Sequence, residues 1–469
     1  MNPLLTCSAT ALASMIRRRE VSSREVVDAH IAQIERVNPA LNAVVAPRFE
    51  AARAEAREAD RLLEAGAPQG PLHGVPCSIK ENFALTGMPC TSGLVSRRGI
   101  VSDRDAVTVA RLRRAGAIPL GVTNLSELCM WMESSNRVYG RTNNPYDHAR
   151  TAGGSSGGEG AIVGAGGTPF GLGADIGGSI RMPAFFNGIF GHKPTGGLVD
   201  NGGQFPLPEN EALRYVTTGP LSRRAEDLAP LLSILADRDI GDPAEIDVTS
   251  LEVISIADDG RIGVSDALKE AQEDAAHALA ARGARVRRTA VHRLSRSLEI
   301  WSAMLDAAGG PSFSSMLGGG REIDSLEELI LLALGRSAHT LPAIGLALVE
   351  KIPKLIPAHG ARLLEEGIHL KRELAELLGP RTVMLYPSHA RPAPRHNHAL
   401  FPPIHWGYTA IFNVMELPVT QVPLGLGRDG VPLGVQVVAG SGQDRTSIAV
   451  ARALEEAFGG WVPPPVARG

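Results

Sequence analysis

One lysine and two serines stand where their side chains could carry out acyl transfer together. Lys80 ends a short apolar run, and the segment 153–158 reads Gly-Gly-Ser-Ser-Gly-Gly with Ser155 near its centre. A second glycine-rich segment, 175–181, contains Ser179. A serine hydroxyl is a weak nucleophile until a base removes its proton, and a buried, neutral lysine can be that base. Each residue alone has an ordinary structural role, but the three together indicate a serine hydrolase.

The glycine-rich segments match three further kinds of site less well. Residues 425–430 match the dinucleotide pattern G-x-G-x-x-G, but a strand is predicted after them where that site needs a helix. Residues 154–158 resemble a nucleophile elbow, but the preceding turn-forming residues 143–147 are not the strand that an elbow needs. No Walker lysine follows either segment, so a phosphate loop is not supported.

Composition excludes several classes of protein. The chain has 469 residues, with 47 basic and 50 acidic side chains and a net charge of −3. The charges are spread without long runs, which argues against a nucleic-acid-binding protein. Apolar residues make up 44%, enough for a large core.

Cysteine usage and hydropathy address cofactors and location. The four cysteines form no C-x-x-C pair and no zinc spacing with histidines, so no metal site and no cofactor are expected. The N-terminus has no secretory pattern, and no stretch reaches about 18 uncharged apolar residues. We expect a cytoplasmic protein of a reducing compartment, with at most surface association with a membrane.

The order of predicted elements indicates an α/β fold. Helices are predicted at 22–38, where Ser22 and Glu25 form a capping box, and at 47–66, 106–115, 325–335, 358–378 and 445–458. Strands are predicted at 117–122, 383–386, 417–422 and 433–438. We expect one large domain with a central mixed sheet covered by helices. Its parts are N-terminal helices at 1–70, a glycine-rich core at 71–205, a helical substrate-side region at 206–380 and a sheet-completing segment at 381–469.

These motifs together resemble the amidase signature hydrolases. The matching segments are 79–82, 153–158 and 175–181, followed by 182–194, 203–206, 408–413 and 417–425. The resemblance covers the whole chain, most strongly at 70–205 and 400–460. Within the family the sequence is most similar to the fatty acid amide hydrolases, especially their type-two branch. The resemblance implies the amidase signature fold and cleavage of a carboxylic amide through an acyl-enzyme.

The resemblance also implies a role for each catalytic residue. Ser179 is the nucleophile, Ser155 relays its proton, and Lys80 accepts that proton and later returns it to the leaving amine. Ser156 supports Lys80 or Ser155 by hydrogen bonding. The family holds the serine that corresponds to Ser155 after a cis peptide bond.

Other site residues follow from the same resemblance. The oxyanion hole is expected at the backbone N–H groups of Ile176, Gly177, Gly178 and Ser179. Asp175 and Arg181 are expected to brace the loop as a structural pair. Cys129 and Met130 fall where fatty acid amide hydrolases line the acyl site, although ordinary core positions account for them equally well. His192 is expected to be structural, because no partner carboxylate is evident in the sequence.

The substrate stays open between alternatives. We expect an N-acyl or fatty acid amide, with esterase side activity. The alternatives are a short-chain or aryl amide, or the glutaminase role of a tRNA-dependent amidotransferase subunit. The apolar stretches 329–334 and 341–349 could line an acyl site or touch a membrane, but a buried helix pair or a homodimer interface accounts for them as well. The expected partners are therefore a small-molecule amide, a membrane surface and a second copy of the chain.

Overall fold

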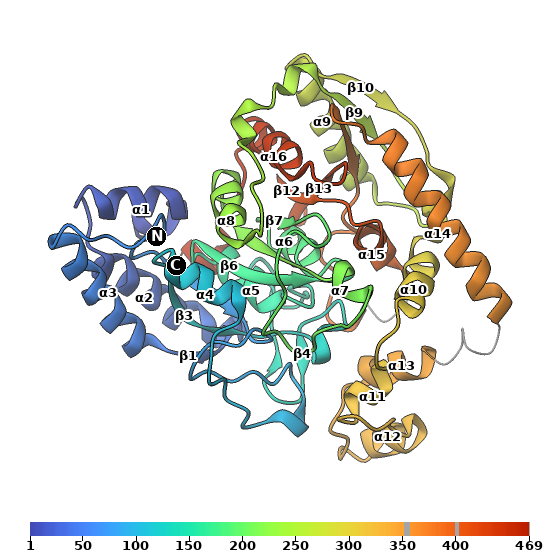
Figure 1. Ribbon diagram of the computed structural model, residues 1–469, viewed down its shortest axis with the longest axis horizontal. Coiled ribbons are helices and arrows are strands. Elements are labelled where there is room, and N and C mark those ends of the chain that lie inside the picture. The colour runs from blue at the N-terminus through green and yellow to red at the C-terminus, as the bar shows by residue number, and fades with distance from the viewer. Residues whose placement is uncertain (351–356, 399–402, 469) are drawn as a thin grey trace.

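The structure is a computed structural model that describes residues 1–350, 357–398 and 403–468. Its strands are β1 (Val44–Pro47), β2 (Pro76–Lys80), β3 (Ile118–Thr123), β4 (Ser135–Asn136), β5 (Gly140–Arg141), β6 (Phe170–Asp175), β7 (Phe190–Lys193), β8 (Thr217–Ser222), β9 (Glu252–Ser255), β10 (Arg285–Arg288), β11 (Thr382–Tyr386), β12 (Val419–Leu426) and β13 (Pro432–Ala439). Eleven of them form one sheet in the order β1-β3-β2-β6-β8-β7-β12-β13-β11-β9-β10 (Figure 1). β2 pairs in parallel with β3 and β6, and β9 pairs in parallel with β11 and β10. The pairs between these two groups are antiparallel, as is the pair of β1 and β3 at one edge, so the predicted mixed sheet is confirmed.

Helices cover both faces of this sheet. They are α1 (Ala9–Arg17), α2 (Ser23–Leu41), α3 (Phe49–Glu64), α4 (Val107–Arg114), α5 (Gly157–Gly164), α6 (Arg181–Phe186), α7 (Ala212–Tyr215), α8 (Leu228–Leu235), α9 (Asp266–Ala281), α10 (Ser297–Ala307), α11 (Phe313–Leu317), α12 (Ser325–Ala333), α13 (Leu341–Val349), α14 (Pro357–Leu377), α15 (Gly407–Val414), α16 (Asp444–Phe458) and α17 (Pro465–Arg468). Within the described residues, no helix combines the length and apolar character that crossing a membrane requires.

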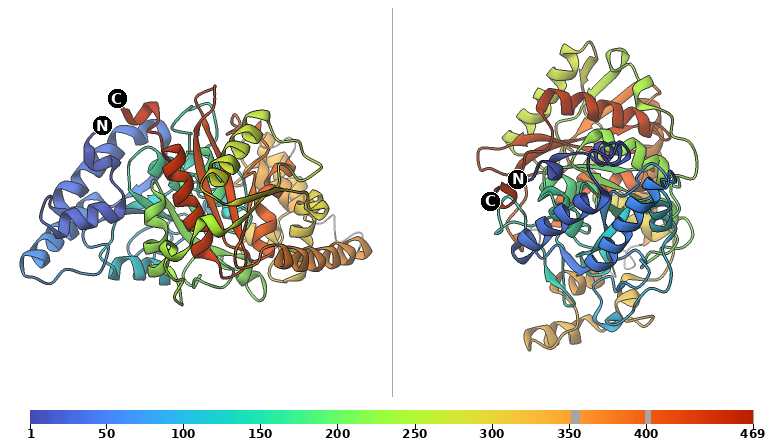
Figure 2. Two further views of the ribbon diagram at one scale, coloured as in Figure 1. Left: turned by 90° about the horizontal axis from the view of Figure 1, so that it is seen from above. Right: turned by 90° about the vertical axis from the view of Figure 1, so that its left-hand side faces the viewer.

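The alternation of side chains along the strands divides the core into two layers. In β11, Val383 and Leu385 join a cluster with α1, α4, α8, α9 and α16, whereas Met384 and Tyr386 join a cluster with α10, α14 and α15. Successive side chains of a strand point to opposite faces, so these clusters lie on opposite sides of the sheet. Helices α2, α3, α5 and α6 share a third cluster with β3. Figure 2 shows α1–α3 and α14 at opposite ends of the molecule.

The predicted helices and strands are present, with small shifts at their ends. The capping box of Ser22 and Glu25 is formed at the start of α2. That helix runs to Leu41, beyond the predicted end, and continues past Pro39, although proline at this position removes one backbone N–H donor. The glycine-rich segment 425–430 joins β12 to β13, as predicted.

The prediction that residues 206–380 are helical is wrong in one respect, because this region also contains three strands of the sheet, β8, β9 and β10. β8 has the sequence Thr-Thr-Gly-Pro-Leu-Ser and is buried along its whole length, so it shows no alternation of apolar and polar residues. β10 has the sequence Arg-Val-Arg-Arg and lies at the edge of the sheet with mostly exposed side chains. Neither pattern carries the usual signal of a strand.

Helices α11, α12 and α13 lie beyond the end of α10, away from the sheet (Figure 1). Phe313 and Leu317 of α11 and Ala343 and Ala347 of α13 share a small apolar cluster with Leu128, which belongs to the core region 71–205. This packing holds the α11–α13 group beside the loop that follows β3. The group thereby forms one wall of the pocket described next.

Candidate active site

Lys80 is the last residue of β2, between β3 and β6 in the sheet. Its side chain is completely buried, and its Nζ donates a hydrogen bond of 2.7 Å to Ser155 Oγ. Burial lowers the pKa of Lys80 below its usual value of 10.5, against the opposing effects of Cys129 and Asp175. The ammonium form is disfavoured where water is excluded, so Lys80 is suited to act as a base.

Ser155 lies in the glycine-rich segment that leads into α5. The peptide bond between Gly154 and Ser155 is cis, as the family resemblance implies. Ser155 is fully buried, and its carbonyl accepts a hydrogen bond of 3.1 Å from Ser134 Oγ. The loop therefore holds the Ser155 hydroxyl against the end of β2.

Ser156 does not support Lys80 or Ser155 in the expected way. Its hydroxyl donates to the carbonyl of Ala174 at 3.4 Å, and its backbone N–H donates to the carbonyl of Ser179 at 3.2 Å. Both contacts join the glycine-rich loop to the segment that carries Ser179. Ser156 thus fixes the two serine-bearing segments relative to each other. The sequence alone gives no sign of these contacts, because the two segments are separated along the chain.

Ser179 lies in the tight turn between β6 and α6 and lines the pocket. Within the described chain, no hydrogen bond uses its hydroxyl or the backbone N–H groups of Ile176, Gly177 and Ser179. The N–H of Gly178, by contrast, donates to Asp175 Oδ1 at 2.7 Å. Three of the four expected oxyanion donors are therefore free in this structure, and Gly178 is not.

Only glycine fits at position 178. Its φ is +118°, and a Cβ there would lie 2.1 Å from Oγ1 of Thr409. Thr409 Oγ1 in turn donates to the carbonyl of Gly177 at 2.8 Å. The indole N–H of Trp301 donates to the carbonyl of Ile176, also at 2.8 Å. These two hydrogen bonds fix the carbonyl groups of Ile176 and Gly177. The N–H groups of Ile176, Gly177 and Ser179 have no partner in the described chain.

The expected structural pair of Asp175 and Arg181 is present and fully buried, with 2.9 Å between Arg181 Nη2 and Asp175 Oδ1. The guanidinium also donates to the Thr409 carbonyl, to Gln436 Oε1 and to Asn413 Oδ1, at 2.8, 2.9 and 2.7 Å. This attraction holds the pKa of Asp175 far below its usual range, although burial acts in the opposite direction. The pair joins the Ser179 turn to α15 and β13.

Glu159 is a buried group near the site that no pattern in the sequence indicated. It projects from α5 and accepts hydrogen bonds from Ser78 Oγ at 2.5 Å and Thr123 Oγ1 at 2.8 Å. Burial raises its pKa to about 8, although these bonds and the charge of Lys80 oppose the shift. A Cβ at Gly171 would lie 1.7 Å from Glu159 Oε2, so that position must be glycine. Near neutral pH the carboxyl is mostly uncharged and only weakly favours the ammonium form of Lys80.

His192 is structural as expected, but it does have a partner carboxylate. Its Nε2 lies 3.1 Å from Asp444 Oδ1, and its Nδ1 lies 2.9 Å from Thr420 Oγ1. The three residues join β7, β12 and α16 and do not line the pocket. Asp444 is distant in the sequence, so no local pattern could reveal this pair.

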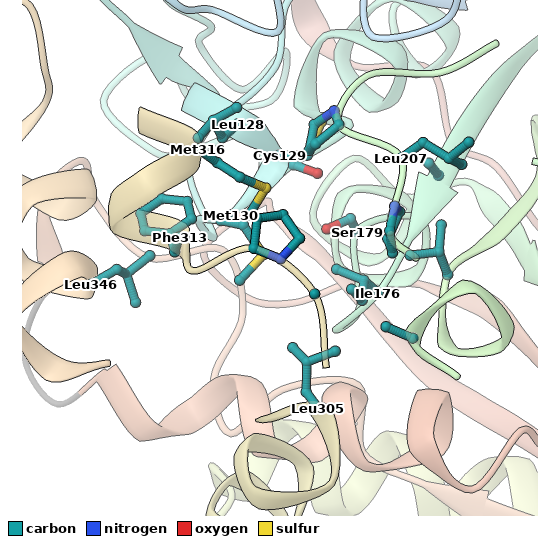
Figure 3. A pocket seen from close by; sticks show the side chains of 18 of the residues that line it. Leu128, Cys129, Met130, Ile176, Ser179, Leu207, Leu305, Phe313, Met316 and Leu346 are labelled. Carbon is teal, nitrogen blue, oxygen red and sulfur yellow. The ribbon is translucent and has the colours of Figure 1, made fainter. Parts of the chain in front are cut away.

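Lys80, Ser155 and Ser179 open into a cavity of about 450 Å³. Figure 3 shows Phe313, Met316 and Leu346 on one side of it and Ser179 and Leu207 on the other. Further apolar lining residues are Leu128, Val349, Leu298, Trp301, Leu305 and Trp406. The sequence offered no signal for most of these residues, because they come from short helices and loops far apart in the chain.

Cys129 and Met130 line this pocket, and their role in contacting a substrate stays a prediction. Burial raises the pKa of the Cys129 thiol, while the neighbouring Lys80 opposes that shift. A thiol with a raised pKa stays protonated and is a poor nucleophile. Cys129 therefore contributes shape to the pocket wall.

Comparison with known proteins agrees with this arrangement. The Amidase family model matches residues 25–448. Fatty-acid amide hydrolase 2-A of Danio rerio is 48% identical, with 99% of this chain and 91% of that protein aligned. Fatty-acid amide hydrolase 2 of Homo sapiens is 44% identical, with 98% and 91% aligned. The structure of 6-aminohexanoate cyclic dimer hydrolase in complex with its substrate superimposes with a TM-score of 0.82, at 27% identity, over 99% of this chain and 98% of that one.

Replacing Arg181 with methionine should strongly destabilise the protein. The substitution leaves the Asp175 carboxylate buried without its partner, which typically costs about 3–5 kcal/mol. The free energy of unfolding from urea titration measures the loss. Arg285→Met is the matched control, because Arg285 pairs with Glu252 at the exposed surface and should contribute less than about 1 kcal/mol. Equal losses in the two variants would contradict the bracing role of Arg181.

Proposed function

This chain belongs to the amidase signature family and is a hydrolase that acts on amide bonds, and from that premise we propose that it cleaves N-acyl amides with a hydrophobic acyl group. The observation that carries the proposal is the 2.7 Å hydrogen bond from buried Lys80 to Ser155, at the wall of an apolar pocket that also contains Ser179. The similarity to fatty-acid amide hydrolase 2 supports a long acyl group.

The proposed reaction is acyl transfer through a serine. Ser179 Oγ attacks the carbonyl carbon, and its proton passes through the Ser155 hydroxyl to neutral Lys80. The resulting oxyanion accepts hydrogen bonds from the free N–H groups of the 176–179 turn, an interaction worth about 3–4 kcal/mol per donor in another serine hydrolase. The carbon–nitrogen bond then breaks as Lys80 returns the proton through Ser155 to the leaving nitrogen. Water attacks the acyl-enzyme by the same route and regenerates Ser179. We expect esters to react as well, since they are easier acyl donors.

The acyl group is proposed to occupy the apolar side of the pocket. Phe313, Met316 and Leu346 lie there, and Cys129 and Met130 line the wall between them and Ser179 (Figure 3). Short-chain or aryl amides are the alternative substrates, since the same three catalytic residues would serve any acyl group. The glutaminase role of an amidotransferase subunit is a weaker alternative, because the pocket wall is mostly apolar.

Hydrolysis rates should rise with acyl length. Each buried methylene contributes about 0.8 kcal/mol, so kcat/KM should increase roughly fourfold per carbon until the channel is full. A series of linear acyl amides measures this, with Ser179→Ala as the inactive control. A flat series that Ser179→Ala abolishes would move the proposal to small or aryl amides. Activity that survives in Ser179→Ala would exclude this residue as the nucleophile.

The activity should fall as the pH is lowered through the pKa of Lys80. The base must be neutral, and burial places its pKa below 10.5, so kcat/KM should rise with pH along a limb below that value. In Lys80→Ala this pH dependence should disappear, and kcat/KM should fall by a factor of at least about 100. A pH profile from about pH 5 to about pH 10 tests this. A limb unchanged in the variant would assign the titration to another group.

We also propose that α12 contacts a membrane surface from which a lipid amide would enter. Leu326, Ile330 and Leu334 follow one another at helical spacing along this helix and its C-terminus, and each is 63–68% exposed. Val349, at the end of the neighbouring helix α13, is also exposed and lines the pocket. Helix α12 packs beside α13, whose last residue lines the pocket that is proposed to hold the acyl group, and this proximity favours a lipid occupant over a second copy of the chain.

The triple variant Leu326→Ser, Ile330→Ser, Leu334→Ser should lose binding to phosphatidylcholine vesicles in a co-sedimentation assay. In the matched control, three exposed apolar residues away from α12 are replaced by serine: Ile100→Ser, Val101→Ser and Leu426→Ser. This control should bind vesicles like the unaltered chain. If the unaltered chain does not bind vesicles but forms dimers, and the first triple variant is monomeric, then the surface joins two copies of the chain instead.

A further inference from the structure

Two polar side chains that line the mostly apolar pocket lack a complete set of hydrogen bonds. Asn82 and Gln204 line the cavity beside Lys80 and are only 1% and 6% exposed. Asn82 Nδ2 donates to Gln204 Oε1 at 3.1 Å. Within the described chain, Asn82 Oδ1 and Gln204 Nε2 are buried and have no partner.

The pattern does not depend on how the two amide groups are oriented. Each amide has one acceptor oxygen and one donor nitrogen, and a single bond between them uses the donor of one and the acceptor of the other. If both groups were turned over, the pair would still leave one acceptor and one donor free. Buried polar groups in native proteins nearly always have partners, either protein groups or ordered waters, so this pair needs a partner that both donates and accepts, and a substrate group of that kind can take the place of water.

The backbone holds both residues in place. The Phe205 N–H donates to the Asn82 carbonyl at 2.8 Å, and the Ala84 N–H donates to the Gly203 carbonyl at 2.9 Å. These bonds place the Gln204 segment beside the segment that follows β2. The Phe205 side chain is covered by the guanidinium of Arg97, 3.7 Å from the ring centroid. The free donor and acceptor are thus positioned before any substrate enters.

We propose that Asn82 and Gln204 form a subsite that binds a hydroxyl group of the substrate. A hydroxyl is the smallest group that can donate to one amide and accept from the other at the same time. The inference rests on the proposed amide hydrolysis and deepens it, since it adds a polar requirement to a substrate that is otherwise apolar. A substrate without the hydroxyl leaves both amides unpaired, and sites built to bind a hydroxyl reject such analogues strongly.

Two matched pairs of amides test the subsite directly in the unaltered enzyme. One pair compares an N-(2-hydroxyethyl) amide with the N-propyl amide of the same acid, and the other compares a 2-hydroxyacyl amide with the plain acyl amide. We expect the hydroxyl compound of one pair to have the higher kcat/KM, by about 10- to 100-fold. The pair that discriminates locates the subsite on the amine side or the acyl side of the scissile bond.

The variant Gln204→Met should reduce this preference to less than about threefold, because a thioether offers no donor and only a weak acceptor. Asn82→Leu is a second variant with the same expectation. Gln272→Met is the matched control: Gln272 is buried, but its amide nitrogen already donates to Ser255 Oγ and to the carbonyls of Ile256 and Leu385. That variant should keep the full preference, even if it is less stable.

The outcomes separate this inference from the proposed function. Hydrolysis of all four amides without preference in either pair would overturn the hydroxyl subsite and leave the amidase proposal intact. A preference that persists in folded Gln204→Met and Asn82→Leu would also overturn it. Failure to hydrolyse any of the four would instead contradict the proposed N-acyl amide activity.

Discussion

The buried ion pair of Asp175 and Arg181 is the interaction on which the rest of the site depends. The carboxylate accepts from the N–H groups of Gly178 and Ile180, so its position determines the turn that carries Ser179. The guanidinium joins that turn to α15 and β13. A buried ion pair adds little net stability over an apolar pair of similar size. Its value here lies in position, because it shapes a turn whose other three backbone donors have no partner in the described chain, and two of the residues that carry them line the pocket.

Burial has opposite consequences for Asp175 and Lys80 because only one of them has a charged partner. Asp175 faces a guanidinium and stays ionised in a site without water. Lys80 takes part in no ion pair within the described chain, and Glu159, the buried carboxyl group behind it, is itself pushed toward its neutral form. The same interior therefore holds an ionised carboxylate beside the turn and lowers the pKa of the amine beside Ser155. That difference is what the proposed role of Lys80 as a base requires.

The sequence predicted the parts of this site that depend on local pattern. Lys80, Ser155 and Ser179 could be located because they lie in glycine-rich segments or at the end of an apolar strand. The helices and strands could be predicted because their hydrophobic patterns are also local. The hydrogen bond of Ser156 to Ala174, the carboxylate partner of His192 and the burial of Glu159 arise from contacts between segments far apart in the chain. The strands β8 and β10 were missed because one is buried on both faces and the other is a polar edge.

The proposed catalytic residues and the pocket walls come from different parts of the chain, so the proposed catalytic residues alone do not identify the substrate. Lys80, Ser155 and the 176–179 turn all come from the region 71–205, packed on the central strands. The walls of the pocket come mainly from 204–216, from α10 and from the short helices α11 and α13, which do not belong to the sheet. Apart from Trp301, whose indole N–H donates to the Ile176 carbonyl, the side chains of these segments form no hydrogen bond with β2 or the Ser179 turn in the described chain. A hydrolase of a cyclic 6-aminohexanoate dimer can therefore share this fold at 27% identity. The substrate choice proposed for this chain accordingly rests on the apolar wall and on the two amides of Asn82 and Gln204.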